Sequence, residues 1–592
     1  MPRLTVEKPK DSKKAFRLFL GSLKSFRLTI VFALIFALVT NVLTLFTPKL
    51  LGNMTNSAVA DLSAGNSIDF APIRQVVLQL IVIYLIVAVL TYFEHYLLAR
   101  ATAFYTKHLR ESIIQKISRL PVSYFDQHQF GDTLSILSND VDTLWNTLTD
   151  GLTQILSSLT TIVGCTVMMF VISPLLALVA IIVVPISVFI ISKITKPAQA
   201  HFKSQRAALG KLNSHIEEDY TGHLIIKSNS HESRSLAAFR ETNTQLFEDS
   251  WRANFESSMA FPVVHFFTNL GYVAICVLGG SLVLSERLLI GNVQAFIQYL
   301  SRFNQPLSNL SQIVVTIQET LAAAERVFGF LEEPEELPDP ANAKRITSVK
   351  GAVEFHDVSF SYNKQTPVIN HFSAKIEPGM QVAIVGPTGA GKTTLINLLM
   401  RFYDPDSGYI TIDGVPTSEM RRSDVRALFG MVLQDTWLFS GTIKDNLAYG
   451  SPKATLRDIK RSATSTGIAH LIESLKGGYS AEISEDSDNI SAGEKQLLTI
   501  TRAMLENPPM MILDEATSNV DTCAEQLIQD AFDQLTKGRT SFVIAHRLST
   551  IRHADLILVI KDGNIVEQGT HESLLQRHGF YAELYNSQFS ED

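Results

Sequence analysis

Long apolar segments dominate the first half of this 592-residue chain. Residues 28–48, 76–93 and 257–285 contain no Asp, Glu, Lys or Arg, and residues 151–192 form one longer block without charge. About 20 apolar residues cross the roughly 30 Å hydrocarbon layer of a bilayer. The longer block is therefore sufficient for two crossings, with Ser173-Pro174 as the turn. Buried helices of a soluble protein would not recur at this length so often.

A sixth apolar segment begins near Leu288 and is interrupted by Arg302. Basic residues precede the first span and recur within residues 100–119 and 193–211, whereas residues 53–72 contain neither Lys nor Arg. An excess of Lys and Arg marks the cytosolic side of a membrane protein. The pattern predicts six spans, with the N-terminus and the C-terminal half of the chain in the cytosol.

The cytosolic segments between the spans are long. Residues 100–146 and 194–256 contain few Gly or Pro residues, so we expect the membrane helices to continue into the cytosol and to turn near 125–131 and 219–227. Residues 11–26 form a basic amphipathic stretch, which predicts a helix lying along the inner membrane surface.

The chain changes character after the acidic, proline-rich residues 331–348. A short apolar strand is expected over 381–385 and a helix over 394–399, with a glycine-rich loop between them. The loop consists of Gly386, Pro387, Thr388, Gly389, Ala390, Gly391, Lys392 and Thr393, and Thr394 follows it. A strand, this loop and a helix form the context that a phosphate-binding loop requires.

The chemistry of such a loop is direct. Its backbone N–H groups and the helix N-terminus attract phosphate oxygens. Lys392 is expected to reach the β- and γ-phosphates, and Thr393 to offer its hydroxyl to Mg²⁺. A second apolar run ends in Asp514-Glu515. Asp514 is expected to hold Mg²⁺, and Glu515 to act as the general base toward the attacking water.

These features resemble those of an ABC exporter half-transporter, in which an α-helical membrane domain of six spans is fused to one α/β P-loop nucleotide-binding domain. The resemblance covers nearly the whole chain. It implies a cytosolic N-terminus with an amphipathic helix over 1–27, a transmembrane domain over 28–330, a linker over 331–348 and a nucleotide-binding domain over 349–592.

The family's other site residues transfer by motif. Tyr362 matches the aromatic residue that stacks on adenine, and Gln434 matches the glutamine that touches Mg²⁺ and contacts the membrane domain. His546 matches the histidine on the γ-phosphate, and Asp521 matches a residue that communicates with the opposite ATP site. The resemblance thus implies ATP and Mg²⁺ as cofactors, with Glu515, His546 and Gln434 as catalytic residues. Segments 124–132 and 217–227 resemble the two coupling-helix regions.

One motif departs from the family. Where a working signature has Leu-Ser-Gly-Gly-Gln, this chain has Ile490 followed by Ser491, Ala492, Gly493 and Glu494. In the family, the signature of one chain closes on the phosphate loop of another. Ala492 adds a methyl group and Glu494 a negative charge beside a phosphate. Residues 484–487 also lose an arginine and a glycine of the family pattern.

These departures predict a heterodimer, in which this chain supplies the catalytic residues of one competent ATP site and the degenerate signature of the other. The partner would be a second ABC half-transporter with a complete signature and without the catalytic glutamate. This arrangement resembles the D subunits of bacterial heterodimeric multidrug exporters. It implies a multi-pass protein of the bacterial cell membrane. A functional homodimer is the alternative.

The substrate is expected to be a hydrophobic or cationic drug, or another small amphipathic compound, moved by alternating access. A lipid or peptide exporter with the same ATP-driven mechanism is the alternative. Membrane lipids are expected partners, and the net charge of −7 gives no support for nucleic-acid binding. Candidate cavity residues on the fifth and sixth spans are His265, Phe266, Phe267, Asn269, Gln298, Arg302, Asn304 and Gln305. A charge within a span needs a partner, and Asp150 or Glu94 are the candidates for Arg302.

Overall fold

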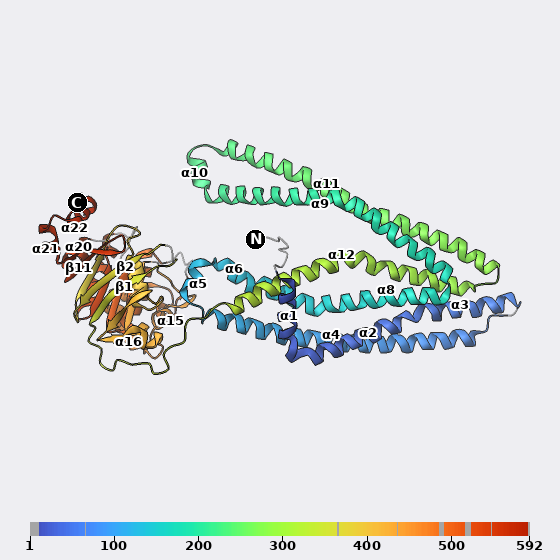
Figure 1. The fold of residues 1–592 in the computed structure, drawn as a ribbon, viewed down its shortest axis with the longest axis horizontal. Coiled ribbons are helices and arrows are strands. Elements are labelled where there is room, and N and C mark those ends of the chain that lie inside the picture. The colour runs from blue at the N-terminus through green and yellow to red at the C-terminus, as the bar shows by residue number, and fades with distance from the viewer. Residues whose placement is uncertain are drawn as a thin grey trace. The chain divides into compact units, whose positions relative to one another are not determined.

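The chain folds into two compact units (Figure 1). The helical unit comprises Met1–Ser118 and Gln129–Glu333, and the sheet unit comprises Arg119–His128 and Pro334–Asp592. The computed structural model describes residues 11–65, 67–363, 366–434, 436–484, 490–514, 522–545 and 548–589.

The helical unit is built from long helices joined by short turns. In chain order these are α1 (Ser12–Ser22), α2 (Arg27–Leu45), α3 (Thr47–Ser63), α4 (Phe70–Ile117), α6 (Phe130–Ser135), α7 (Val141–Asn146), α8 (Leu152–Ile172), α9 (Pro174–Thr221), α10 (His223–Ser228), α11 (Glu232–Leu284) and α12 (Ile290–Glu332). One 3-10 turn, Leu23–Phe26, separates α1 from α2, and π-helical turns flank α7.

Three helical stretches among the described residues are long and apolar enough to cross a membrane: Ser12–Ser63, Phe70–Ile117 and Phe130–Ile172. Asn269–Leu284 is a shorter apolar helix. The break between α8 and α9 lies at Ser173, as predicted. The Ser173 hydroxyl caps α9, and Pro174 occupies its first turn, where a missing N–H costs nothing.

The longest helices exceed the thickness of a bilayer. α4 and α9 have 48 residues each, and α11 has 53. At 1.5 Å per residue they are about 70–80 Å long, more than twice the hydrocarbon layer. They therefore continue outside it, as the sequence predicted. α9 and α11 lie side by side and are joined by α10 (Figure 1).

The sheet unit contains a six-stranded sheet, a four-stranded antiparallel sheet and a short pair. The six-stranded sheet has the order β12-β11-β3-β10-β9-β6, formed by β12 (Asn564–Gly569), β11 (Leu556–Lys561), β3 (Gln381–Val385), β10 (Thr540–Ile544), β9 (Met510–Asp514) and β6 (Phe429–Val432). The four-stranded sheet has the order β2-β1-β4-β5, formed by β2 (Ile369–Ile376), β1 (Val353–Phe360), β4 (Ser407–Ile412) and β5 (Val415–Pro416). β7 (Gly441–Thr442) pairs with β8 (Glu482–Ile483).

The helices of the sheet unit are shorter. They are α5 (Val122–Gln127), α13 (Lys392–Leu399), α14 (Arg422–Arg426), α15 (Ile443–Leu447), α16 (Leu456–Ser465), α17 (Ala469–Ser474), α18 (Ala492–Glu506), α19 (Thr522–Thr536), α20 (Leu548–His553), α21 (His571–Gln576) and α22 (Phe580–Phe589). The central strands β3, β9 and β10 are parallel and almost wholly buried. This burial explains why they are nearly continuous apolar runs in the sequence.

The acidic linker is fastened to the sheet unit along its length. Glu336 N–H donates to the Arg119 carbonyl at 3.0 Å, and Arg422 Nη1 donates to the Leu337 carbonyl at 2.6 Å. Lys344 N–H donates to the Glu419 carbonyl at 2.9 Å. The segment has no regular secondary structure, as its prolines predict, but these hydrogen bonds hold it against the sheet unit.

Candidate functional site

The glycine loop connects the carboxyl end of β3 to the N-terminus of α13. Gly391, the residue before α13, has a φ of +101°, and a Cβ there would lie 2.7 Å from Ile369 Cδ1. A Cβ on Gly386 would lie 2.3 Å from the Ile560 carbonyl oxygen. Both positions need glycine, because a side chain would collide with its neighbours. The backbone of the loop therefore stays open to a close ligand.

Lys392 is half-buried at the first position of α13. Its ammonium donates hydrogen bonds to the Gly386 carbonyl at 2.7 Å and to the Pro387 carbonyl at 3.1 Å. Burial lowers the pKa of Lys392 from its usual value, and the Asp514 carboxylate opposes this shift. Neutral carbonyl oxygens are weaker acceptors than phosphate oxygens. An anion at the loop would therefore be a stronger partner for this lysine.

The parallel strands bring the other polar groups to the same edge. β10 pairs with β3 on one side and β9 on the other, with Ile544 opposite Ile384 and Asp514. The carboxyl ends of parallel strands meet at one edge of a sheet, where α/β proteins bind ligands. Asp514, the last residue of β9, therefore lies on the same edge as the glycine loop. Glu515, Asp521 and His546 lie outside the described residues.

A cavity of about 470 Å³ occupies this edge. It is lined by Val368, Thr388, Gly389, Gly391, Lys392, Thr393, Thr394, Gln434, Asp514 and Ile544. All of these except Val368 and Ile544 were predicted as site residues. Gln434 follows β6 and Asp514 ends β9, so the cavity joins the glycine loop to elements that are distant in sequence. Gly386, Pro387, Ala390 and Tyr362 are not among its lining residues.

Tyr362 is held beside α13. Its hydroxyl donates to Thr394 Oγ1 at 3.3 Å and accepts from Asn397 Nδ2 at 3.1 Å. The side chain remains 41% exposed, so a planar ligand has access to the ring. Asn397 was not predicted, although its position three residues after Thr394 places both on one face of α13.

The signature segment forms a closed cap at the N-terminus of α18. Ser491 Oγ accepts a hydrogen bond from Glu494 N–H at 3.4 Å, and Glu494 Oε2 accepts one from Ser491 N–H at 2.7 Å. Glu494 therefore places a carboxylate at the helix end that favours anions. Ala492 is exposed beside it, and Gly493 is buried. Residues 485–489 lie outside the described part of the chain.

Comparison with known proteins decides the family. Residues 30–307 match the model described as "ABC transporter transmembrane region", and residues 369–518 match the model described as "ABC transporter". A Mycobacterium bovis protein named "Fatty acid ABC transporter ATP-binding/permease protein" is 44% identical over 520 residues, which cover 88% of this chain and 82% of that protein. The chain belongs to the ABC transporter family. It is an ATP-hydrolysing transporter with a helical membrane domain.

Other similar proteins extend over almost the full length of this ABC transporter. The "Uncharacterized ABC transporter ATP-binding protein YfiC" of Bacillus subtilis is 36% identical, covering 98% of this chain and 95% of its own. A solved structure, "Structure of a bacterial Atm1-family ABC exporter with ATP bound", matches with a TM-score of 0.70 at 27% identity, covering 96% of this chain and 99% of that one. The predicted fold class is confirmed, and the transporter is an exporter.

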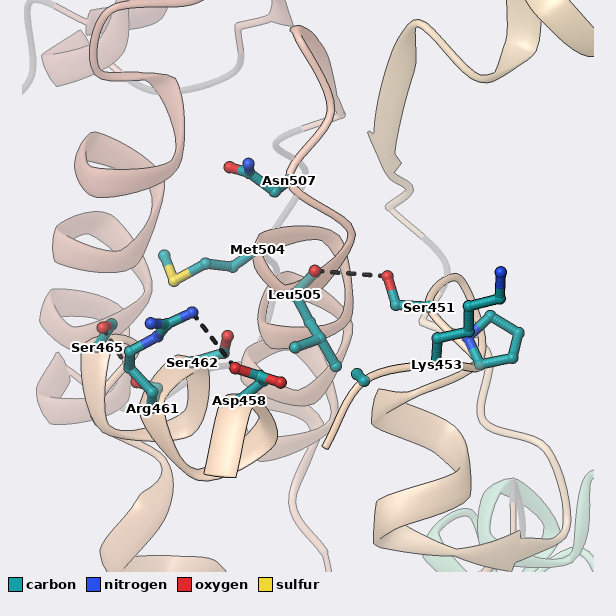
Figure 2. Close-up of a pocket in the computed structure, with 11 residues that line it drawn as sticks. Ser451, Lys453, Asp458, Arg461, Ser462, Ser465, Met504, Leu505 and Asn507 are labelled. Carbon is teal, nitrogen blue, oxygen red and sulfur yellow. Dashed lines mark hydrogen bonds and ion pairs between the residues drawn. The ribbon is translucent and has the colours of Figure 1, made fainter. Parts of the chain in front are cut away.

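A second, larger hollow lies in the sheet unit of the transporter and is lined by no residue of the glycine loop (Figure 2). It measures about 690 Å³ and is lined by residues of the loop before α16, of α16 itself and of the C-terminal end of α18. Among its lining residues, Arg461 pairs with Asp458 at 3.6 Å, Ser451 donates to the Leu505 carbonyl at 3.4 Å, and Ser465 donates to the Arg461 carbonyl at 3.1 Å. None of the predicted ATP-site residues lines it, so size alone does not identify the functional site.

The candidate cavity residues of the exporter are spread over α11 and α12. Phe266 and Asn269 are exposed on α11, and Phe267 is half-buried there. On α12, Gln298, Arg302 and Asn304 are half-buried. The side chains of His265 and Gln305 lie outside the described ones. In the helical unit, a hollow of about 930 Å³ is lined instead by residues around α3 and α4, including Phe46 and Arg74.

The predicted partners of Arg302 are wrong. Glu94 is buried and Asp150 is exposed, but Arg302 Nη1 donates to the Thr44 carbonyl at 2.6 Å. In a continuous helix this carbonyl would accept from residue 48, and Pro48 has no N–H. The charge of Arg302 thus satisfies a carbonyl group at the break between α2 and α3.

Tyr299 also stabilises the chain at the break between α2 and α3. This fully buried residue donates its hydroxyl to the Leu45 carbonyl at 2.5 Å. Two side chains of α12 therefore hold the end of α2. An unsatisfied backbone group in a bilayer costs several kcal/mol, which explains why a charged residue is tolerated in this helix.

Replacing Arg302 with methionine is expected to destabilise the exporter. The change removes a charge-assisted hydrogen bond worth about 1.5–3 kcal/mol, and we expect the thermal unfolding midpoint in nanodiscs to fall by about 1–2 °C. Arg287→Met, at an exposed position in the turn before α12, is the matched control and should not change the midpoint. An unchanged midpoint for Arg302→Met would refute this stabilising role.

Proposed function

We propose that this exporter subunit is one half of a heterodimer with one hydrolysis-competent and one degenerate ATP site. Its partner would be a second ABC half-transporter that carries a complete signature and lacks the catalytic glutamate. This subunit contributes the glycine loop, Asp514, Glu515 and His546 to the competent site, and its own signature closes the degenerate one.

The reciprocal cap of Ser491 and Glu494 carries this proposal. In a working signature, the serine and the helix N-terminus hold the γ-phosphate of an ATP bound to the opposite chain. Here the Glu494 carboxylate accepts from the Ser491 backbone at that helix end. A fixed negative charge repels an incoming phosphate and already interacts with the positive end of the helix dipole. A homodimer would carry this defect at both sites.

The residues of the cavity at the glycine loop suit ATP with Mg²⁺. A hydroxyl from Thr393, a side-chain amide oxygen from Gln434 and a carboxylate from Asp514 converge there, and these hard oxygen donors are those that Mg²⁺ prefers. When bound, Mg²⁺ neutralises the charge of the phosphates. Lys392 would bind the β- and γ-phosphates, Tyr362 would stack on adenine, His546 would contact the γ-phosphate, and Asp521 would communicate with the opposite site. Glu515 would take the proton of the attacking water.

An exposed apolar surface supports a partner chain. Tyr220, at the end of α9, is 86% exposed, and Leu224 and Ile225 of α10 are 81% and 68% exposed. Clustered large apolar side chains on a surface mark an interaction site. The second coupling-helix region would therefore dock on another subunit rather than remain in water.

The substrates would be small amphipathic compounds, including hydrophobic or cationic drugs, moved by alternating access. The similar proteins are named for fatty acid transport, for an "ATP-dependent lipid A-core flippase" (33% identical) and for a "Probable multidrug resistance ABC transporter" (35% identical). Fatty acids and lipid A are themselves amphipathic, so a lipid exporter with the same engine is the second candidate. The protein would lie in a bacterial plasma membrane, with its N-terminus and nucleotide-binding domain in the cytosol.

Repairing the signature tests the heterodimer. We expect the purified chain with Ala492→Gly and Glu494→Gln to hydrolyse ATP at least about tenfold faster than the unmodified chain alone, because each gained contact to a charged phosphate contributes about 1.5–3 kcal/mol. The measurement is steady-state ATPase activity in nanodiscs. Glu506→Gln removes a carboxylate from the other end of α18 and is the matched control.

Two outcomes would contradict the proposal. The unmodified chain alone could hydrolyse ATP as fast as the repaired one, in which case the altered signature is functional and the exporter is a homodimer. Glu506→Gln could raise the activity equally, in which case the charge at the signature has no specific role.

A further inference from the structure

A short segment after α13, Arg401–Asp404, is held in one conformation by buried contacts. Arg401 is 7% exposed and has a φ of +53°. Its guanidinium donates to the Thr417 carbonyl at 2.9 Å, the Met420 carbonyl at 2.7 Å and the Asp404 carboxylate at 2.9 Å. A buried charge satisfied by several fixed acceptors makes the segment a rigid support.

Tyr403 projects from this segment onto the aromatic residues near the ATP cavity. Its ring lies edge-on to Tyr362, with 5.0 Å between the centroids and an interplanar angle of 87°. It also contacts Phe360 at 5.3 Å, and Phe360 contacts Tyr362 at 5.0 Å. Edge-to-face aromatic pairs have a preferred geometry. A tilt of the Tyr362 ring would therefore displace Tyr403.

The hydroxyl of Tyr403 donates to the Asp126 carboxylate on α5. Burial, together with the neighbouring Asp126 charge, raises the pKa of Tyr403 above its usual value, so the phenol keeps its proton at physiological pH. α5 belongs to the sheet unit and follows α4 directly in the chain. One side chain thus contacts both the aromatic residue beside the glycine loop and the first coupling-helix region.

The same segment also holds the linker that follows α12. Asp404 accepts from Arg422 Nη2 at 2.7 Å, and Arg422 Nη1 donates to the Leu337 carbonyl. Arg426 lies over the Phe402 ring at 5.2 Å and donates to the Glu336 carboxylate at 2.8 Å. Both chain segments that lead toward the spans are therefore attached to Arg401–Asp404.

We propose that Tyr403 is a positioning residue that transmits the occupancy of the adenine site from Tyr362 to α5. A change in the position of the Tyr362 ring shifts the Tyr403 ring, and the hydrogen bond from the Tyr403 hydroxyl then shifts Asp126. The glycine loop would hold the phosphates, whereas the Tyr362 ring would stack on adenine, so this route would report the base rather than the triphosphate. The inference rests on the proposed adenine-stacking role of Tyr362.

The test follows hydrogen–deuterium exchange of the α5 amides in the full transporter assembled in nanodiscs. We expect ATP to slow this exchange in the unmodified protein, and inorganic tripolyphosphate, which has no base, to slow it much less. Tyr403→Phe keeps the ring and loses the hydroxyl, so it should remove at least about two thirds of the ATP effect while KM for ATP changes by less than about twofold. Asp126→Asn should act likewise.

The pair is examined further as a double-mutant cycle. If Tyr403 and Asp126 act through their hydrogen bond, the double variant should match either single variant, because coupled residues are not additive. Tyr409→Phe is the matched control, since Tyr409 is an exposed tyrosine of β4 that stacks on His356. It should retain the full ATP effect.

Three results would overturn the proposal: full slowing by ATP in Tyr403→Phe, equal loss in Tyr409→Phe, or equal slowing by tripolyphosphate and ATP. Failure of the adenine-stacking role has a separate readout, because Tyr362→Ala would then leave KM for ATP unchanged. The Tyr403–Asp126 cycle is scored independently of that result.

Discussion

Replacing Lys392 with methionine is expected to reduce ATP hydrolysis by the assembled transporter at least about 100-fold, because removing a single charged donor from a preorganised site has effects of this size. Methionine keeps the unbranched chain and loses the charge. In the structure the ammonium is held by two carbonyl oxygens of its own loop. We expect phosphate oxygens to take over these donors, so the loss affects both ATP binding and turnover.

Steady-state ATPase activity and nucleotide affinity measure this effect. Lys375→Met is the matched control, because Lys375 is an exposed lysine of β2 that pairs with Glu354 and Glu377. It should retain the activity of the unmodified protein. If Lys392→Met retained more than about a tenth of the activity, the phosphate-binding role of Lys392 would be wrong.

Replacing Glu515 with glutamine is expected to lower kcat for ATP about 100- to 10,000-fold, the contribution of a general base, while ATP affinity stays within about threefold. Glu515 follows Asp514, the last residue of β9, which lines the cavity at the glycine loop. The substitution is nearly isosteric, so binding should survive the loss of the base. In the proposed heterodimer, this one change should silence the whole complex.

Single-turnover ATP hydrolysis and equilibrium ATP binding separate the two effects. Glu482→Gln, at an exposed position of β8, is the control and should leave both unchanged. Retention of full turnover by Glu515→Gln would place the base elsewhere. Loss of ATP binding together with turnover would show that Glu515 organises the site rather than acting as its base.

Local sequence patterns predicted the long helices and the strand and helix around the glycine loop, but not most of the other strands and helices of the sheet unit. The apolar run before Gly386 became β3, and a helix follows the glycine loop, although α13 begins at Lys392, two residues before the expected start at 394. The turn at Ser173 and the long helices that leave the membrane were also predicted. These features depend on residues that are adjacent in the chain, where hydropathy, a missing N–H or a glycine acts directly on the backbone.

The partners of charged residues were not predictable in this way. Arg302 was expected to pair with a carboxylate, but it donates to Thr44, a carbonyl made available by Pro48 in another helix. A hydropathy pattern shows that a charge needs a partner, and not which group will be near it. The packing of α12 against α2 and α3 decides that the acceptor for Arg302 is a backbone carbonyl and not a carboxylate.

The sequence by itself determined the membrane character of the first half, the glycine loop and the altered signature, because each is a continuous stretch with its own local chemistry. Only the tertiary structure decided that Asp514 and Gln434 join the loop in one cavity, that Glu494 turns back onto Ser491, and that Tyr403 reaches Asp126 across 277 residues of chain. Such contacts depend on the packing of whole elements, and no short window of sequence contains the geometry that brings them together.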